Sequence, residues 1–565
     1  MPPRAPPRAG AHTRHAISPP YPPPAGMGAM PKARFRRIAG NAWICQIHAL
    51  RASLLLRRTL RLTATPQASL GAAFGYGGHT SAMLERRWTA PTPAYVYSVT
   101  KGHHLPIFSF NPADPDTHMP ANDLRLLIIQ PTHYKAPTDR TLFKTKRRQM
   151  VPLALPYLAA LTPPEWKVTL LDEQLEDIDF DAPVDVVALT AWTLHSYRAY
   201  DIAKEFRKRG VKVIMGGPHV YFNAEEAAEH VDAVGVGEAE PIWKEMLEDA
   251  AANRLKSIYR ATPLKELNGL PAPRYDLLDL KKFGPFRTFA VQSSRGCPFV
   301  CDFCSERFYL GGRYRWRPVD EMVNELKLIK NRGSHFFFGE SNFGGKKSRA
   351  MELMEGLVPL GIRWSTLWSS NLCLDKEFLD LARKSGVMHV NIGIESIDKD
   401  ILDGMRKGWN KASRYHEMFE NLRQRDISYS LNFIFGFDDE DHDIYRATIS
   451  FLEEHKVPAA YFNILTPTKG TALFNRMEKA GRIINAPEID RWPGQICQIW
   501  PKNCSPKEME ARIQWMYKKF YSMRSIFKRL PFPPRTRSDM SSWILDLTER
   551  RMAFSSTGNN DFDIY

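Results

Sequence analysis

The stretch that decides the fold of this 565-residue chain is Ser293-Ser294-Arg295-Gly296-Cys297-Pro298-Phe299-Val300-Cys301-Asp302-Phe303-Cys304. It directly follows an apolar run, 288–292, and it carries three cysteines with C-x3-C-x2-C spacing on what reads as one loop. Thiolates are soft ligands that suit zinc or an iron–sulfur cluster, and a [4Fe–4S] cube takes four ligands. We therefore expect Cys297, Cys301 and Cys304 to hold a cluster that keeps one iron open to a substrate or cofactor.

A structural zinc knuckle is the alternative interpretation of this loop, because its ligand spacings overlap this one. Such a site needs a fourth Cys or His nearby, and the next candidates along the chain are His335 and Cys373. A cluster with an open iron needs no fourth protein ligand, so the spacing favours the cluster.

The loop resembles the signature of the radical S-adenosylmethionine (radical SAM) enzymes, which place an aromatic residue, here Phe303, before the last cysteine. The resemblance implies that the amino and carboxylate groups of SAM chelate the open iron. It also implies that an electron from the cluster breaks a C–S bond of SAM and gives a 5′-deoxyadenosyl radical. An electron donor such as flavodoxin or ferredoxin would then be a partner.

Residues 266–480 are expected to form the core of such an enzyme. Apolar runs at 288–292, 335–338, 363–368, 389–394, 429–435 and 459–464 alternate with helical stretches, which predicts a partial (β/α)6 barrel. Active sites of β/α barrels lie at the carboxyl ends of the strands. The resemblance implies that the residues there bind SAM, namely Phe303, Gly339, Glu340, Ser370, Asn371, Glu395, Ser396, Phe435 and Gly436. Gly339-Glu340 matches the family's glycine-glutamate motif only in part, because Phe338 replaces its first glycine.

A first domain is expected over 119–265, after a basic head, 1–118. Apolar runs at 124–129, 168–171, 184–189, 211–215 and 233–236 alternate with helical stretches, of which 197–209 and 242–251 are the clearest. Near-continuous apolar strands separated by helices predict an α/β, Rossmann-like parallel sheet that is covered on both faces. Ligands of such sheets bind at the carboxyl ends of the strands.

Four short motifs lie at those strand ends, and their order resembles the cobalamin-binding-type domain of one large radical SAM subclass. They are Leu171-Asp172-Glu173, Thr190-Ala191-Trp192-Thr193, Met215-Gly216-Gly217-Pro218-His219 and Val236-Gly237-Glu238-Ala239-Glu240. The cobalamin contacts that this resemblance implies are Thr190, Thr193, Gly216, Gly217, Gly237 and Glu238. The D-x-H-x-x-G motif, whose histidine ligates cobalt in many B12 proteins, is absent. His133 and His219 are interpreted as ordinary surface or turn histidines, with ligation as the alternative.

The basic head holds 14 of the chain's 78 Lys and Arg but only 3 of its 62 Asp and Glu. It is rich in proline and has no sustained periodicity, so we expect disorder. The head has the composition of an organelle transit peptide. The interpretation that we favour is that the start codon was assigned too far upstream and that the protein begins at Met119. The rest of the chain is nearly balanced in charge, which disfavours nucleic acid as a partner. No run is apolar enough for a transmembrane segment, and the scattered cysteines indicate a reducing, cytoplasmic location.

Residues 481–565 are expected to form a helical extension. Ser505-Pro506-Lys507-Glu508 is a capping box that opens a helix, and this helix should dock through Met509, Ile513, Met516, Tyr517 and Phe520. Its basic residues are interpreted as a solvated face, with an anionic partner as the alternative; they are Lys518, Lys519, Arg524, Lys528 and Arg529.

The leading functional hypothesis is a cobalamin-dependent radical SAM enzyme that methylates an unactivated carbon of a small-molecule or lipid-like substrate. One alternative keeps the radical but cyclises or rearranges the substrate without methyl transfer, as in porphyrin-ring cyclase relatives. The other is a non-catalytic, metal-stabilised binding protein.

Overall fold

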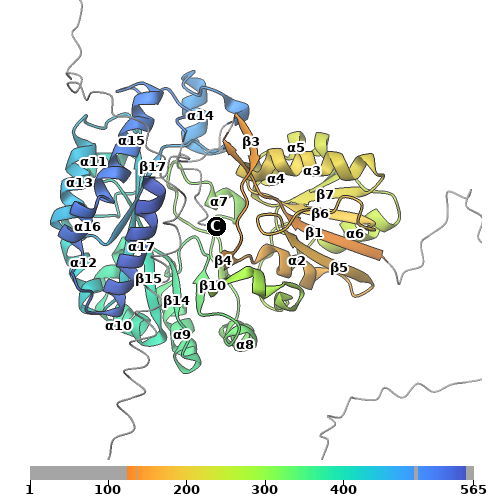
Figure 1. Ribbon diagram of the computed structural model, residues 1–565, viewed down its shortest axis with the longest axis horizontal. Coiled ribbons are helices and arrows are strands. Elements are labelled where there is room, and N and C mark those ends of the chain that lie inside the picture. The colour runs from red at the N-terminus through yellow and green to blue at the C-terminus, as the bar shows by residue number, and fades with distance from the viewer. Residues whose placement is uncertain (1–123, 137, 489–490, 492–493, 495, 555–565) are drawn as a thin grey trace, which may run out of the picture. The chain divides into compact units, whose positions relative to one another are not determined.

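The computed structural model describes residues 124–554 apart from 137, 489–490, 492–493 and 495. The head, 1–118, lies outside the described residues. The first sheet is parallel and six-stranded, in the order β5-β1-β6-β7-β8-β9 (Figure 1). Its strands are β1 (Leu124–Gln130), β5 (Trp166–Asp172), β6 (Val186–Thr190), β7 (Lys212–Gly216), β8 (Ala233–Val236) and β9 (Ile258–Arg260). The predicted Rossmann-like sheet is confirmed, and β9 is a strand that the pattern did not predict.

Helices cover both faces of this sheet because successive residues of each buried strand point to opposite faces. On one face, Leu127 and Ile129 pack with α3 (Ser196–Lys208), α4 (Pro218–Phe222) and α5 (Ala224–His230). On the other face, Leu126 and Ile128 pack with α2 (Ala154–Leu161) and α6 (Trp243–Ala251). The double cover explains why the strands read as continuous apolar runs.

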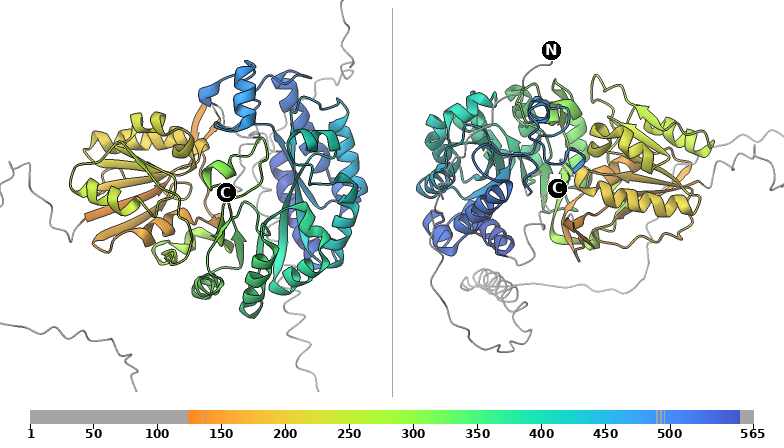
Figure 2. Two further views of the ribbon diagram at one scale, coloured as in Figure 1. Left: turned by 180° about the vertical axis from the view of Figure 1, so that it is seen from behind. Right: turned by 90° about the horizontal axis from the view of Figure 1, so that it is seen from above.

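The second sheet is parallel and seven-stranded, in the order β17-β16-β15-β14-β13-β10-β4, and it curls into a half barrel (Figure 2). Six strands are those that the sequence predicted: β10 (Phe283–Val291), β13 (His335–Phe338), β14 (Trp364–Trp368), β15 (Val387–Glu395), β16 (Ser428–Phe435) and β17 (Ala459–Ile464). The helices between them are α8 (Val319–Ile329), α9 (Lys347–Leu357), α10 (Lys376–Ser385), α11 (Lys399–Gly404), α12 (Tyr415–Gln424) and α13 (Ile444–Glu454).

The seventh strand, β4 (Arg148–Val151), comes from the stretch between β1 and β5. It follows a small hairpin, β2 (Tyr134–Ala136) and β3 (Asp139–Leu142), and pairs in parallel with β10, with Val151 opposite Phe289. The sequence did not indicate this strand, because Arg148-Gln149-Met150-Val151 is short and half polar. One segment of the first domain therefore completes the sheet of the second.

Four helices follow the barrel strands: α14 (Ala472–Lys479), α15 (Pro506–Phe520), α16 (Met523–Arg529) and α17 (Arg537–Ala553). Of the predicted capping box, the bond from the N–H of Glu508 to the Ser505 side chain is present, and the docking face of α15 is confirmed, since its five expected apolar residues are buried. The helix covers the edge strand β17: the N–H of Phe462 donates to Tyr517 Oη (3.1 Å) and that of Ala460 to Tyr521 Oη (3.2 Å). These two hydroxyls satisfy a strand edge that would otherwise be open to pairing.

Candidate active site

The cysteine loop follows the carboxyl end of β10 and starts with β11 (Ser294–Arg295), which pairs antiparallel with β12 (Arg315–Trp316). Gly296 turns the chain into the loop with a φ of 90°, and a Cβ there would lie 2.0 Å from the carbonyl oxygen of Arg313. Only glycine fits such a position. The N–H of Cys297 then donates to the carbonyl of Gly311 at 3.0 Å. The strand pair and the glycine thus fix where the first cysteine stands.

The three thiols of the loop are half-buried and lie close enough to influence one another electrostatically. Burial raises the pKa of each thiol, for Cys304 to about 12, so ligation rather than solvent must provide the driving force for deprotonation. Among the described residues, no three Cys, His, Asp or Glu side chains converge on a single ion.

The two candidate fourth ligands of a zinc site lie elsewhere. His335 lies at the amino end of β13, whereas the cysteine loop follows the carboxyl end of the parallel neighbour β10. The Nε2 atom of His335 lies 2.7 Å from Ser365 Oγ. Cys373 is fully buried in the barrel core. Neither residue supplies the fourth ligand that the zinc interpretation requires.

Glu340 closes the turn after β13 and points at the residues that lead into the cysteine loop. Its carboxylate accepts hydrogen bonds from the N–H of Ser293 (2.9 Å), from Ser293 Oγ and from Ser294 Oγ (2.6 Å). Burial raises its pKa, which these hydrogen bonds partly oppose. Gly339, just before it, donates its N–H to the carbonyl of Val291 at 2.9 Å. In this structure the predicted SAM contact therefore positions the cysteine loop.

Lys407 is a candidate binding residue that sequence reasoning missed. It is buried after α11, its Nζ lies 2.5 Å from Glu395 Oε1, and it donates to the carbonyl of Gly393 at 2.9 Å. Glu395 ends β15 with a φ of 61°, an unfavourable conformation that turns its carboxylate toward this lysine. The charge of Lys407 also lowers the pKa of the Cys297 and Cys301 thiols, against the larger effect of burial. A buried cation and carboxylate beside the cysteine loop match the zwitterionic end of an amino-acid ligand.

The remaining predicted SAM contacts are distributed over the neighbouring strand ends. Ser370 Oγ donates to Asn410 Oδ1 at 2.5 Å, and Asn410 Nδ2 donates to the carbonyl of Ile394 at 2.9 Å. Asn410 therefore connects the ends of β14 and β15. Asn371 is exposed, and Ser396 is buried with its Oγ accepting the N–H of Asp398.

The last strand end in this set is that of β16. The ring of Phe435 packs on Tyr445 of α13, with ring centroids 5.1 Å apart, and the N–H of Gly436 donates to Glu440. Phe303 instead contacts Phe437, with ring centroids 6.5 Å apart. Phe437 is thus the aromatic residue of this strand end that meets the cysteine loop.

The carboxyl edge of the first sheet carries the predicted cobalamin contacts. Thr190 ends β6, Gly216 ends β7, and Thr193 begins the turn into α3. Gly217 has a φ of 102°, and a Cβ there would lie 2.8 Å from the carbonyl oxygen of Ala191, so the two strand ends touch through glycine. Between them Trp192 is 49% exposed. This edge has a glycine turn without side chains and an exposed indole ring, and both can pack against the face of a large planar ring.

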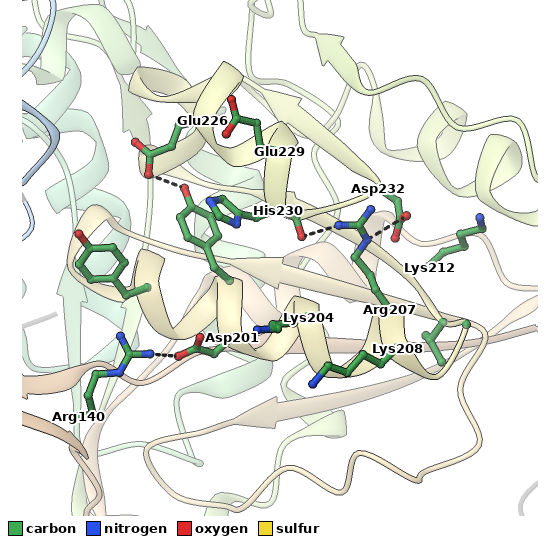
Figure 3. A pocket seen from close by; sticks show the side chains of 14 residues that line it. Arg140, Asp201, Lys204, Arg207, Lys208, Lys212, Glu226, Glu229, His230 and Asp232 are labelled. Carbon is green, nitrogen blue, oxygen red and sulfur yellow. Dashed lines mark hydrogen bonds and ion pairs between the residues drawn. The ribbon is translucent and has the colours of Figure 1, made fainter.

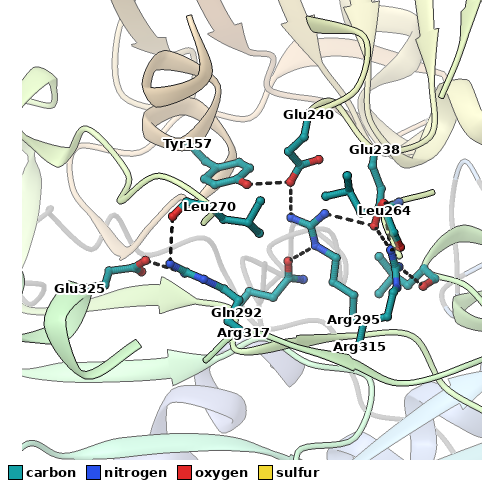
Figure 4. Close-up of polar contacts among 11 residues, drawn as sticks. Tyr157, Glu238, Glu240, Leu264, Leu270, Gln292, Arg295, Arg315, Arg317 and Glu325 are labelled. Carbon is teal, nitrogen blue, oxygen red and sulfur yellow. Dashed lines mark hydrogen bonds and ion pairs between the residues drawn. The ribbon is translucent and has the colours of Figure 1, made fainter. Parts of the chain in front are cut away.

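Glu238 pairs with two arginines of the strand pair β11 and β12 (Figure 4). Its carboxylate bonds Arg295 Nη1 (3.1 Å) and Arg315 Nη1 (2.8 Å), while Glu240 bonds Arg295 Nη2 (2.7 Å). Tyr157 Oη donates to Glu240 at 2.7 Å. All four charged side chains are nearly buried, and Arg295 lies two residues before Cys297. Glu238 therefore ties the edge of the first sheet to the cysteine loop.

A second buried ion pair joins the same two sheets. Asp172, at the end of β5, accepts from Arg148 Nη1 of β4 at 2.8 Å, and both side chains are almost inaccessible. Glu173, the next motif residue, accepts the N–H of Thr132 at 3.0 Å and bonds Arg198. The Leu-Asp-Glu motif is thus a structural junction in this chain.

The histidines of the first sheet are buried, so their interpretation as surface or turn residues was wrong. His219 is fully buried, its Nε2 lies 2.6 Å from Tyr200 Oη, and its Nδ1 contacts Asn223. Burial lowers the pKa of His219 to about 3. His133 stacks on Phe143, with ring centroids 4.9 Å apart, and lies next to His195. The contacts of His219 are those of a structural histidine.

A cavity of about 750 Å³ lies beside α3 and α5 of the first domain (Figure 3). Its charges are largely matched within it, because Arg140 pairs with Asp201 and Arg207 with Asp232. None of the predicted site residues lines this cavity. The strand ends, rather than this cavity, form the candidate site.

Comparisons with known proteins bear on both halves of the chain. Residues 291–452 match the Radical SAM superfamily, and residues 141–247 match the B12 binding domain. The chain is 30% identical over 395 residues to Bacteriochlorophyllide d C-12(1)-methyltransferase of Chlorobaculum tepidum, which covers 68% of this chain and 85% of that protein. It is 24% identical over 379 residues to Anaerobic magnesium-protoporphyrin IX monomethyl ester cyclase of Cereibacter sphaeroides, which covers 61% of each.

A solved structure shows the same fold. The cobalamin-dependent S-adenosylmethionine radical enzyme OxsB, with aqua-cobalamin and S-adenosylmethionine bound, superposes with a TM-score of 0.55 at 16% identity. The match covers 77% of this chain and 72% of that one.

Proposed function

Since this chain belongs to the radical SAM superfamily, in the subclass with a B12-binding domain ahead of the radical SAM domain, we propose that it methylates an unactivated carbon of a tetrapyrrole-like substrate. Its class is that of the cobalamin-dependent radical SAM methyltransferases, and its cofactors are a [4Fe–4S] cluster, SAM and cobalamin. The tetrapyrrole is the part that we add. It is supported by similarity to two bacteriochlorophyllide methyltransferases, at 30% and 29% identity.

The observation that carries the proposal is the buried contact between the two strand edges, from Glu238 and Glu240 to Arg295. When bound, the cluster and SAM supply a radical and cobalamin supplies a methyl group. The radical and the methyl group can react at the same carbon atom only if the two strand edges that hold their cofactors keep a fixed position relative to each other. Arg295 provides this relation, because it pairs with the first edge and leads directly into Gly296 and Cys297.

The chain's own residues would then orient SAM and exclude water. We propose that Lys407, which follows α11, meets the SAM carboxylate and that Glu340 and Glu395, after β13 and at the end of β15, face its ammonium, since all three side chains are buried. The aromatic pair Phe303 and Phe437 would cover one side of the same space. Burial of these groups strengthens their electrostatic contacts with a ligand.

Partners and location complete the proposal. No helix among the described residues is long and apolar enough to cross a membrane. We propose a reducing, cytoplasmic location, a flavodoxin or ferredoxin as electron donor, and no nucleic-acid partner. We also propose that the B12-binding domain spans 119–265, that the radical SAM core spans 266–480, and that a helical extension begins at 481.

Radical cyclisation of a tetrapyrrole is the second candidate, because the chain is also similar to a magnesium-protoporphyrin cyclase. It ranks lower, since that identity is 24% against 30% for the methyltransferase. The two candidates differ in how they use SAM, because methyl transfer consumes a second SAM for each product.

The test is anaerobic turnover of the reconstituted enzyme with hydroxocobalamin, SAM, a reductant and a panel of chlorophyllides and porphyrins. Methylation predicts a product heavier by one methylene, with one S-adenosylhomocysteine and one 5′-deoxyadenosine for each product. Deoxyadenosine that depends on substrate, without any S-adenosylhomocysteine, would favour cyclisation instead. If no tetrapyrrole stimulates SAM consumption but another substrate class does, the substrate proposal fails and the methyltransferase class remains.

A further inference from the structure

Helix α17 has its polarity reversed with respect to the protein core. Its buried residues include Ser542, Asp546 and Glu549, whereas Met540, Ile544 and Leu547 are exposed on the opposite side. Ile544 is 54% and Leu547 43% exposed. Surface helices of globular proteins normally bury their apolar stripe. The outward stripe of α17 is therefore not used to hold this fold together.

Polar contacts attach the helix to the barrel instead. Asp546 Oδ2 bonds Arg529 Nη2 of α16 at 2.7 Å, with both side chains fully buried, and Arg529 Nη1 donates to the carbonyl of Val457 at 2.6 Å. Ser542 Oγ lies 3.2 Å from Ser428 Oγ of β16. The interpretation of Arg529 as part of a solvated face was thus wrong. The helix is fixed by these polar contacts and by Trp543, which packs with Ile526 and Leu530, and it presents Met540, Ile544 and Leu547 outward.

The exposed apolar surface continues onto the neighbouring turn. Phe532 is 68% and Phe527 51% exposed, and their ring centroids lie 5.6 Å and 5.2 Å from that of Trp543 on α17. We call the set formed by Phe527, Phe532, Met540, Ile544, Leu547 and Phe554 the outer apolar face. An exposed set of this kind is typical of an interaction surface.

The charges around this face identify its partner. Within 522–554 the three carboxylates are engaged: Asp546 and Glu549 are buried, and Asp539 accepts from the N–H groups of Arg535 and Thr536. The cations of the same segment are exposed, namely Arg524, Lys528, Arg535, Arg537 and Arg551, and of these Lys528 pairs with Glu453 of α13. A surface that is apolar at its centre and cationic around it matches the acyl chains and anionic headgroups of a lipid bilayer.

We infer that α16 and α17 dock this enzyme on an anionic membrane surface through the outer apolar face. A second copy of the chain would fit less well, because it would bring two cationic rims together. The described helices lie on the membrane in this arrangement and do not cross it, in agreement with their length and composition. This inference does not depend on the proposed substrate.

The test is sedimentation of the full chain with vesicles of phosphatidylglycerol and phosphatidylcholine, and with vesicles of phosphatidylcholine alone. The double variant Ile544→Ser, Leu547→Ser removes two exposed side chains from the face. Leu328→Ser on α8 is the matched control, since Leu328 is 67% exposed on another helix. We expect the wild type and the control to bind the anionic vesicles, and the double variant to bind at least about tenfold more weakly. All three proteins should melt alike, because the changed residues are exposed.

Two results would overturn the inference. If the double variant binds like the wild type, or if the wild type does not bind, the outer apolar face is not a membrane contact. If light scattering shows a dimer of the wild type that the double variant loses, with no vesicle binding, the face belongs to a second copy.

Discussion

The carboxyl edges of the two sheets use their polar side chains in different ways. At the barrel edge, Glu395 and Lys407 pair with each other, and both lie close enough to the Cys301 thiol to affect its pKa. At the edge of the first sheet, Asp172 and Glu238 are already paired with arginines of the barrel sheet and cysteine loop. This difference indicates that the barrel edge provides chemical contacts, whereas the first edge provides shape and attachment.

The largest effect should come from the cysteines. Changing Cys297, Cys301 or Cys304 to Ala removes one iron ligand, so 5′-deoxyadenosine formation should fall to the level of cluster-free protein, with most of the fold intact. Cys504→Ala is the control, because this half-buried residue lies outside the loop. Iron content and deoxyadenosine would be measured after reconstitution. Undiminished deoxyadenosine formation by any of the three variants would contradict the assignment of the cluster to this loop.

The next effect tests whether Glu238 attaches the two edges. Glu238→Gln leaves Arg315 buried without its counter-ion, while Arg295 keeps Glu240, and this should cost about 3–5 kcal/mol in the free energy of unfolding. Glu225→Gln breaks the exposed pair with Arg260 and should cost about 0–1 kcal/mol. Urea unfolding measures both changes, and the ratio of deoxyadenosine to product measures uncoupling. Equal losses for the two variants would show that the buried network does not attach the edges.

A smaller effect is expected from the glycine turn of the first edge. Gly217→Ala forces a Cβ against the backbone of Ala191 and should cost about 2–4 kcal/mol, with weaker cobalamin binding. Gly210 also has a positive φ, of 77°, but an added Cβ would meet nothing within 4 Å. Gly210→Ala should therefore cost only about 1 kcal/mol of backbone strain and leave cobalamin binding unchanged. Absorbance titration with hydroxocobalamin separates the two, and equal affinities would indicate that this turn does not contact the ring.

The smallest effect near neutral pH concerns His219, whose contribution to stability depends on pH. Burial lowers the pKa of His219 from 6.5 to about 3, so the folded protein keeps it neutral while the unfolded chain takes up a proton below pH 6.5. His219 therefore lowers the free energy of unfolding by about 1.4 kcal/mol for each pH unit as the pH falls from 6.5 toward 3. In His219→Gln that part of the slope should disappear. The spectrum of bound hydroxocobalamin should stay the same, of the base-off type, and a shift to another type would assign cobalt ligation to His219.

The sequence predicted the parts of this molecule that depend on local pattern. Continuous apolar runs identified the six long barrel strands, and the cysteine spacing identified the loop, because both signals lie within a few neighbouring residues. The role of Glu238 could not be predicted in this way, since its partner Arg295 lies 57 residues further along the chain. Lys407 and the buried pair of Arg529 with Asp546 were missed for the same reason: a charged residue reads as exposed until the fold supplies its partner.

Strand β4 makes the two domains inseparable as modules. The chain leaves the first sheet after β1, adds an edge strand to the barrel next to β10, and returns to form β5. A cut at any one point between the domains would strip β10 of this neighbour and expose a sheet edge. Recombination that exchanges the cobalamin-type half between relatives would have to carry a matching β4, so the interface and the barrel edge are inherited together. During synthesis, the same strand must wait for β10, which is made more than a hundred residues later, before it can pair.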